Sequence, residues 1–127
     1  GLLSFVVSPK ASAKGYPEGL MKALGNVAEA TDYVVYFKFV IDAEPESNHY
    51  TVPQTILDLA RQATGLVYVS PFTVYAKPYL GEVSSVWDDG LIDKEQTAKN
   101  YRRAAELALQ HPGLRVSVQT HTFLGVA

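Results

Sequence analysis

The chain has 127 residues, of which 47% are hydrophobic and 19% are charged, and its formal net charge at pH 7 is −2. This composition indicates one globular domain and gives no sign of the basic surface that binding to nucleic acid needs. Because there is no cysteine and no apolar run long enough to span a membrane, disulfides and thiolate-held clusters are excluded, and we expect a cytoplasmic protein without a membrane partner.

Four short apolar segments alternate with segments of helical periodicity along the chain. The expected strands are Leu2–Val7, Val34–Ile41, Leu66–Val69 and Leu114–Val118. Pro17 and Pro53 each stand where a first helical residue is expected, and Asp93 with Gln96 resembles a capping box before a third helix. Helix-length connections between apolar strands predict a single α/β domain over residues 1–127, with a parallel sheet and right-handed crossovers.

The third helix carries a stripe of small and aromatic residues. We expect this stripe to face the sheet, with the charged residues of the helix mostly elsewhere. The stripe consists of Ala98, Tyr101, Ala105 and Ala108.

One cation interrupts the second strand. Lys38 stands in the middle of the apolar run Val34–Ile41. A buried ammonium without a partner is costly. Lys38 is therefore expected either to pair with a carboxylate across the sheet or to point into a cavity.

The first strand raises a problem of exposure. Sequential strands would put Leu2–Val7 near one edge of the sheet. Natural proteins usually cover a long apolar edge strand, and this one carries neither an inward charge nor an early proline. We expect either a missing part of the chain or another subunit to cover it, and a homodimer is one such arrangement.

Polar residues follow each expected strand. In a parallel sheet the carboxyl ends of the strands meet at one side, where ligands bind. The four ends are Ser8-Pro9-Lys10, Asp42-Ala43-Glu44, Ser70-Pro71-Phe72 and Gln119-Thr120-His121. Together they suit a polar ligand with a charged part and a planar part, although polar residues also simply mark where strands meet loops. The sequence contains no metal-binding histidine pattern, no phosphate-binding glycine loop and no nucleophile elbow, so motifs do not identify a reaction.

Four segments, in this order, resemble the carboxyl-terminal half of 7-carboxy-7-deazaguanine synthase. This family consists of radical S-adenosylmethionine (SAM) enzymes of queuosine and deazapurine biosynthesis. The segments are Ser8-Pro9-Lys10, Phe37–Asp42, Val67–Pro71, and Gln119-Thr120-His121 followed by Leu124-Gly125. The resemblance covers nearly the whole chain, is most specific in the first and last segments, and is weakest from Phe72 to Asp93.

The resemblance implies a fold, a reaction and a set of binding residues. The fold is part of an incomplete TIM-like barrel of β/α units. The reaction is the magnesium-dependent ring contraction of 6-carboxy-5,6,7,8-tetrahydropterin, which a 5′-deoxyadenosyl radical starts. The implied binding residues are Ser8 and Lys10 for the ribose and methionine part of SAM, Ser70 and Pro71 for its adenine, and Gln119 and His121 for the pterin.

The chain departs from this family in one decisive respect. The three-cysteine cluster motif and the GGEP segment belong to the family's amino-terminal half, and neither occurs here. We therefore expect a carboxyl-terminal half that is inactive alone, with the 4Fe-4S cluster and Mg²⁺ held by a missing amino-terminal half or by a cluster-bearing subunit. Two alternatives stay open: a stand-alone, non-catalytic α/β module that binds a nucleotide-like ligand, and an unrelated α/β domain.

Overall fold

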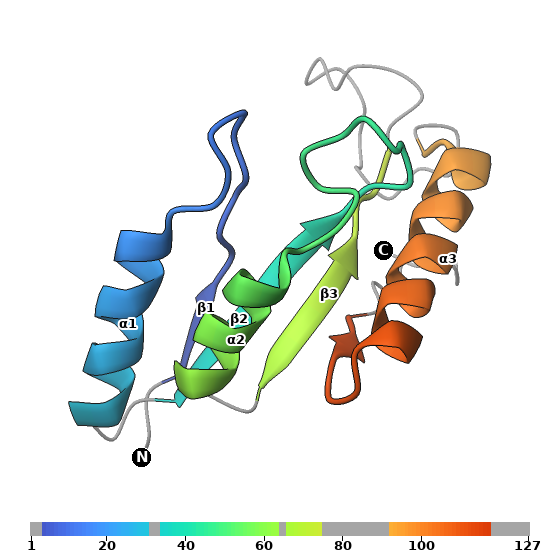
Figure 1. Cartoon of the computed structure of the whole chain (residues 1–127). Helices are drawn as coiled ribbons and strands as arrows, with labels where there is room; N and C mark the ends of the chain where they lie inside the picture. The colour runs from blue at the N-terminus through green and yellow to red at the C-terminus, as the bar shows by residue number, and fades with distance from the viewer. Residues whose placement is uncertain (1–3, 31–33, 64–65, 75–91, 118–127) are drawn as a thin grey trace, which may run out of the picture.

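The computed structural model describes residues 4–30, 34–63, 66–74 and 92–117. Strands and helices alternate along the chain as predicted (Figure 1). The elements are β1 (Ser4–Val7), α1 (Glu18–Ala30), β2 (Val34–Ile41), α2 (Gln54–Ala63), β3 (Val67–Pro71), α3 (Lys94–Gln110) and β4 (Arg115–Val116). Within these ranges, every helix is too short or too polar to cross a bilayer.

The four strands form one all-parallel sheet in the order β1-β2-β3-β4. The predicted α/β fold with a parallel sheet is thus confirmed. Consecutive strands are neighbours, and each connection between them contains a helix. The carboxyl ends of the strands consequently point in one direction, which is upward in Figure 1. In the described part of the chain β1 forms one edge of the sheet, and Val6 there is 66% exposed.

One face of the sheet is buried against helices. Burial alternates along β2, so that Phe37 and Phe39 are fully buried while Tyr36, Lys38 and Val40 are half-buried. Met21 of α1, Leu57 of α2 and Leu107 of α3 belong to the same core cluster as these two rings. Burying a side chain of this size stabilises the fold by roughly 1.5–3 kcal/mol. Since all three helices join one cluster with one face of the sheet, the opposite face carries no described helix.

The buried stripe of α3 is shifted by one position along the sequence relative to the predicted stripe. The buried positions are Thr97, Asn100, Ala104 and Leu107. Each precedes a residue of the predicted alanine-rich stripe, and Ala105 of that stripe is exposed. One residue corresponds to about 100° of rotation about the helix axis. Two polar residues, Thr97 and Asn100, therefore face the sheet, where the apolar pattern predicted Ala98 and Tyr101.

Asn100 explains this rotation. Its side chain is fully buried, its Oδ1 accepts a hydrogen bond from Ala43 N–H at 2.8 Å, and its Nδ2 donates to the Phe72 carbonyl at 2.9 Å. Thr97 Oγ1 accepts in the same way from Val74 N–H at 3.1 Å. Buried backbone groups at strand ends need such partners. The amide and the hydroxyl join the ends of β2 and β3 to α3, which an alanine could not do.

Replacing Asn100 by alanine should lower the free energy of unfolding by about 2–4 kcal/mol. The change leaves the Ala43 N–H and the Phe72 carbonyl, both in partly buried hydrogen bonds, without their partner, and each such loss is costly. Urea unfolding followed by circular dichroism measures the effect. Asn48→Ala, at an exposed loop asparagine, is the matched control and should change stability by less than about 0.5 kcal/mol. Similar losses in both variants would contradict the assigned role of Asn100.

Candidate functional site

Three of the four predicted strand ends lie in the described part of the chain. Ile41 pairs with Pro71, so the ends of β2 and β3 are level, whereas β1 pairs with β2 only as far as Val7 opposite Phe37. Ser8 follows Val7 directly and therefore ends its strand earlier along the sheet than Pro71 does. The carboxyl edge is thus staggered. The fourth end, with Gln119 and His121, lies outside the described residues.

Ser8 and Lys10 form a small polar pair after β1. Lys10 Nζ donates a hydrogen bond to Ser8 Oγ at 3.0 Å, and both side chains are exposed. Pro9 between them is buried and anchors the turn. An ammonium beside a hydroxyl offers donors to a carboxylate or to ribose oxygens. In water such a pair contributes little to stability. Because both groups are exposed, they are available to a ligand.

Ser70 and Pro71 face opposite sides of the sheet. Neighbouring residues of a strand alternate between its faces. Pro71 pairs with the core residue Ile41 and is fully buried, so its ring packs on the helix side. Ser70 pairs with Val40 and is 3% exposed, and its side chain belongs to the opposite face. The two residues predicted to contact one ligand group therefore differ in what their side chains can reach.

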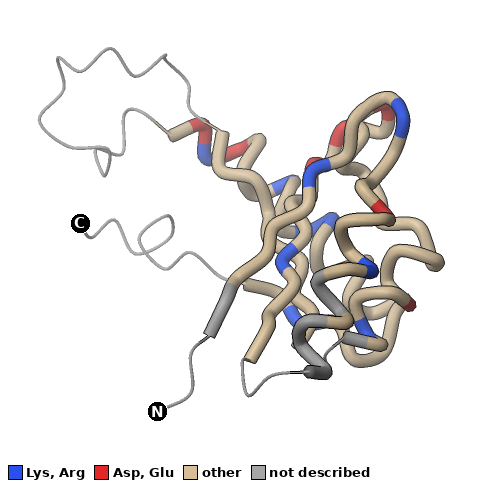
Figure 2. The backbone as a smooth tube through the Cα atoms, turned by 90° about the vertical axis from the view of Figure 1, so that its left-hand side faces the viewer, with Lys and Arg blue, Asp and Glu red and all other residues tan. Residues whose placement is uncertain are grey.

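A hollow of about 270 Å³ opens on this opposite face. We call it the sheet-face hollow, and its lining residues are Val6, Tyr36, Lys38, Tyr68 and Ser117. Of the two arrangements expected for Lys38, the structure favours the cavity. The described strands contain no Asp or Glu that could pair with it, and Figure 2 shows the carboxylate positions on loops and helices.

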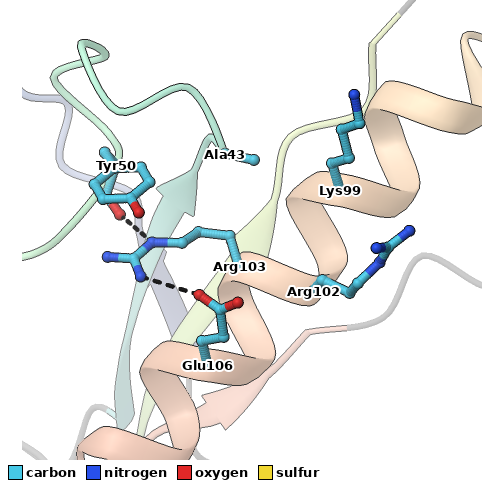
Figure 3. A pocket seen from close by; sticks show the side chains of 6 residues that line it. All are labelled: Ala43, Tyr50, Lys99, Arg102, Arg103 and Glu106. Atoms are coloured by element: carbon cyan, nitrogen blue, oxygen red, sulfur yellow. Dashed lines mark hydrogen bonds and ion pairs between the residues drawn. The ribbon is translucent and has the colours of Figure 1, made fainter.

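A second depression of about 260 Å³ lies beside α3. Its lining residues, shown in Figure 3, are Ala43, Tyr50, Lys99, Arg102, Arg103 and Glu106. Arg103 Nε donates to the Tyr50 carbonyl at 2.8 Å, and its guanidinium carbon lies 3.8 Å from the centre of the Tyr50 ring. A further hydrogen bond joins Arg103 to Glu106 Oε2 at 3.2 Å.

These contacts connect α3 to the loop after β2, so the depression beside α3 is a structural contact region. The Arg103 side chain is only 12% exposed and its charge already faces the Glu106 carboxylate. Lys99 Nζ lies 3.9 Å from Glu95 Oε1. Figure 3 shows the side chains of Lys99 and Arg102 pointing away from Arg103. The cations therefore do not converge on one point where an anion could bind. Sequence patterns carry no signal for these contacts, because Tyr50 is 53 residues from Arg103.

Two buried polar atoms belong to neighbouring rings in the loops after β1 and β2. Tyr16 Oη and His49 Nδ1 have no hydrogen-bond partner among the described residues. Their rings meet edge to face with centroids 6.3 Å apart, and the Tyr16 ring also meets Phe39 at 5.6 Å. Burial raises the pKa of the Tyr16 hydroxyl to about 12. Neither residue stood out in the sequence, because each lies in a polar loop without a motif.

Metal ligands do not gather in the described part of the chain. No group of three His, Cys, Asp or Glu side chains there is close enough to hold a metal ion. Comparison with known proteins adds no relative, since no family model, curated protein or solved structure matches the chain. The fold and geometry thus define an α/β protein whose polar groups lie at the carboxyl edge and on the helix-free face of a parallel sheet.

Replacing Tyr16 by phenylalanine should make the protein less sensitive to alkaline pH. The pKa of Tyr16 rises from 10.0 to about 12 on folding, so between these values the unfolded chain releases a proton that the folded protein retains. Wild-type stability is then lost as the pH rises through this window. Below pH 10 the variant should be at least as stable, because it buries no unpaired hydroxyl.

Urea unfolding of both proteins at pH 8 and pH 11 measures this effect of Tyr16. The difference in unfolding free energy should shift in favour of phenylalanine at the higher pH. A difference that is the same at both pH values would show that the Tyr16 hydroxyl is not buried as described.

Proposed function

We propose that this chain supplies part of the SAM and pterin sites of a 7-carboxy-7-deazaguanine synthase. Such an enzyme is a radical SAM lyase that contracts the ring of 6-carboxy-5,6,7,8-tetrahydropterin. The resemblance of the segments at Ser8, Phe37, Val67 and Gln119 motivates the proposal. One observation carries it further: the parallel sheet has sequential strand order, and its three described helices lie on one face.

This one-sided arrangement is what a segment of a β/α barrel requires. In a barrel the helices form the outer layer, and ligands bind at the carboxyl ends of the strands. A doubly wound α/β sheet instead carries helices on both faces and reverses its strand order. The order β1-β2-β3-β4 contains no such reversal. The proposal therefore assigns the helix-free face to the inside of an incomplete barrel.

In this proposal the predicted residues have separate roles. The hydroxyl of Ser8 and the ammonium of Lys10, 3.0 Å apart and exposed, bind the ribose and methionine part of SAM. Ser70 meets the adenine from the helix-free face, while Pro71 fixes the end of β3 from the core side. Gln119 and His121, which follow the last strand in sequence, bind the pterin.

The residues of this chain do not fit an iron–sulfur cluster. Thiolates are the usual ligands of such clusters, and the chain contains no cysteine. The 4Fe-4S cluster and Mg²⁺ are therefore assigned to an amino-terminal half or to a cluster-bearing subunit. The contribution of this chain is to bind and orient SAM and the pterin, and it is inactive without that partner.

Binding of SAM to the purified chain tests the first part of the proposal. Equilibrium dialysis should detect binding to the wild-type protein. The variants Lys10→Ala and Ser70→Ala should bind about 3- to 10-fold more weakly, because each removes a hydrogen bond to the ligand. Lys22→Ala and Thr55→Ala, at exposed positions of α1 and α2, are matched controls and should bind normally.

Complementation tests the second part. The chain is mixed anaerobically with a cluster-bearing amino-terminal half of a 7-carboxy-7-deazaguanine synthase, Mg²⁺, a reductant, SAM and the tetrahydropterin. Mass spectrometry should detect 5′-deoxyadenosine and 7-carboxy-7-deazaguanine only in the complete mixture. Binding of SAM without product would favour the stand-alone, non-catalytic module, and the absence of both would refute the proposed function.

A further inference from the structure

The helix-free face carries a row of side chains with one sign of charge. The strand register sets Lys38 of β2 beside Tyr68 of β3, and Tyr68 beside Arg115 of β4. Laterally paired residues of a parallel sheet project from the same face, so the two cations flank one tyrosine. The described segments of the four strands contain no Asp or Glu. The charged side chains of the described strands are therefore both cations, although the whole chain is slightly acidic.

We infer that the sheet-face hollow is a binding site for a planar aromatic carboxylate. Lys38 lines the hollow, is half-buried, and has no hydrogen bond or ion pair to any described residue. Removing an ammonium from water without a counter-charge is unfavourable. A carboxylate in the hollow supplies that charge. Arg115, which is exposed and pairs with Tyr68, adds a second cation to the same face.

The aromatic residues of the hollow determine the shape of the ligand. The rings of Tyr36 and Tyr68 have centroids 6.3 Å apart and are inclined at 42°. They form two apolar walls, and the exposed side chain of Val6 adds a third apolar surface. Flat aromatic ligands bury the most area against such walls. The volume of about 270 Å³ is suited to one or two fused rings.

The hollow is also held in place by the backbone. Ser117 N–H donates to the Val69 carbonyl at 2.9 Å, which fixes the position of Ser117 at the margin of the hollow. Three different strands supply the tyrosines, the lysine and Val6 through regular pairing. A site built on paired strands changes little when a ligand enters, and little binding energy is lost in ordering it.

A second copy of the chain is the competing occupant of this face. Two such faces packed against each other would bring Lys38 and Arg115 close to their own copies. Like charges brought together at an interface oppose association. Charge complementarity thus favours an anionic ligand over a copy of the chain. The inference needs only the geometry of the hollow and does not depend on the proposed function.

A pair of probes that differ in charge tests the inference. They are 2-naphthoate, a planar aromatic carboxylate, and 2-naphthalenemethanol, its neutral counterpart. Titrations of the ¹⁵N-labelled chain, followed by NMR, give both affinities and locate the binding residues. The wild-type protein should bind naphthoate about 10-fold more tightly than the alcohol, as expected for a hydrogen bond to a charged group. The largest shifts should fall on Tyr36, Lys38, Tyr68 and Ser117.

Substitution of Lys38 separates the charge from the apolar contacts. Lys38→Met keeps the apolar stem and should abolish the preference for naphthoate while the alcohol still binds. Lys38→Arg keeps the charge and should retain the preference, which guards against a variant that is merely misfolded. Tyr68→Ala should weaken both probes, and Lys22→Met on the exposed surface of α1 should affect neither.

Three results would overturn the inference. These are equal affinities of the wild-type chain for both probes, an unchanged preference in Lys38→Met, and a dimer in sedimentation that binds neither probe. The failure of the proposed function is distinguishable from all three. If naphthoate binds through Lys38 while SAM does not bind and complementation yields no product, the anion site stands and the synthase assignment falls.

Discussion

The structure depends on the packing of three helices against a single face of the sheet. Every second residue of β2 contributes to that face, and its rings Phe37 and Phe39 are fully buried. The alternate residues of the same strand are consequently committed to the other face. Because the period of a strand is two, no residue can serve both. The division of the strand into a core side and a helix-free side thus follows directly from its pattern.

The same division explains why adjacent residues at the end of β3 behave differently. Pro71 is part of the packed core, and Ser70 beside it belongs to the helix-free face. A substitution at Pro71 would disturb the packing against the helices, whereas one at Ser70 would change a buried polar group on the opposite face. A motif read only as consecutive letters hides this difference. The strand register is what assigns the two residues to different faces of the sheet.

Much of the fold could be predicted from local apolar patterns. The run Val34–Ile41 is rich in β-branched and aromatic residues, and it forms β2 over the same bounds. The strand expected at Leu66–Val69 instead continues through Ser70 and Pro71, because pairing with β2 extends to Ile41. A proline was expected to stop this strand, but Pro71 lies beyond Val69, the last residue of β3 that pairs with β4, and a missing N–H is tolerated where one side of a strand is unpaired. Pairing between strands decides such ends, and a single segment does not show it.

The sequence predicted less about the sites. Asn100 and Thr97 are buried because backbone groups far away in sequence need partners, and an apolar pattern carries no trace of that need. Arg103 likewise reaches Tyr50 across the fold. Lys38 was conspicuous as a cation in an apolar strand. Its neighbours became known only once the register placed Tyr68 of β3 beside it. Residues whose roles depend on distant partners were therefore missed or left open.

Asn100 also holds the carboxyl edge of the sheet. It binds the backbone of Ala43 and of Phe72, which lie just after the ends of β2 and β3. These are the segments that form the carboxyl edge, while the sheet-face hollow lies further down the strands around Lys38 and Tyr68. The shape of the edge therefore depends on α3, and that of the hollow depends on strand pairing alone. The affinity for a ligand that contacted both regions would therefore depend on two sets of interactions: the contacts of α3 and the pairing of the strands.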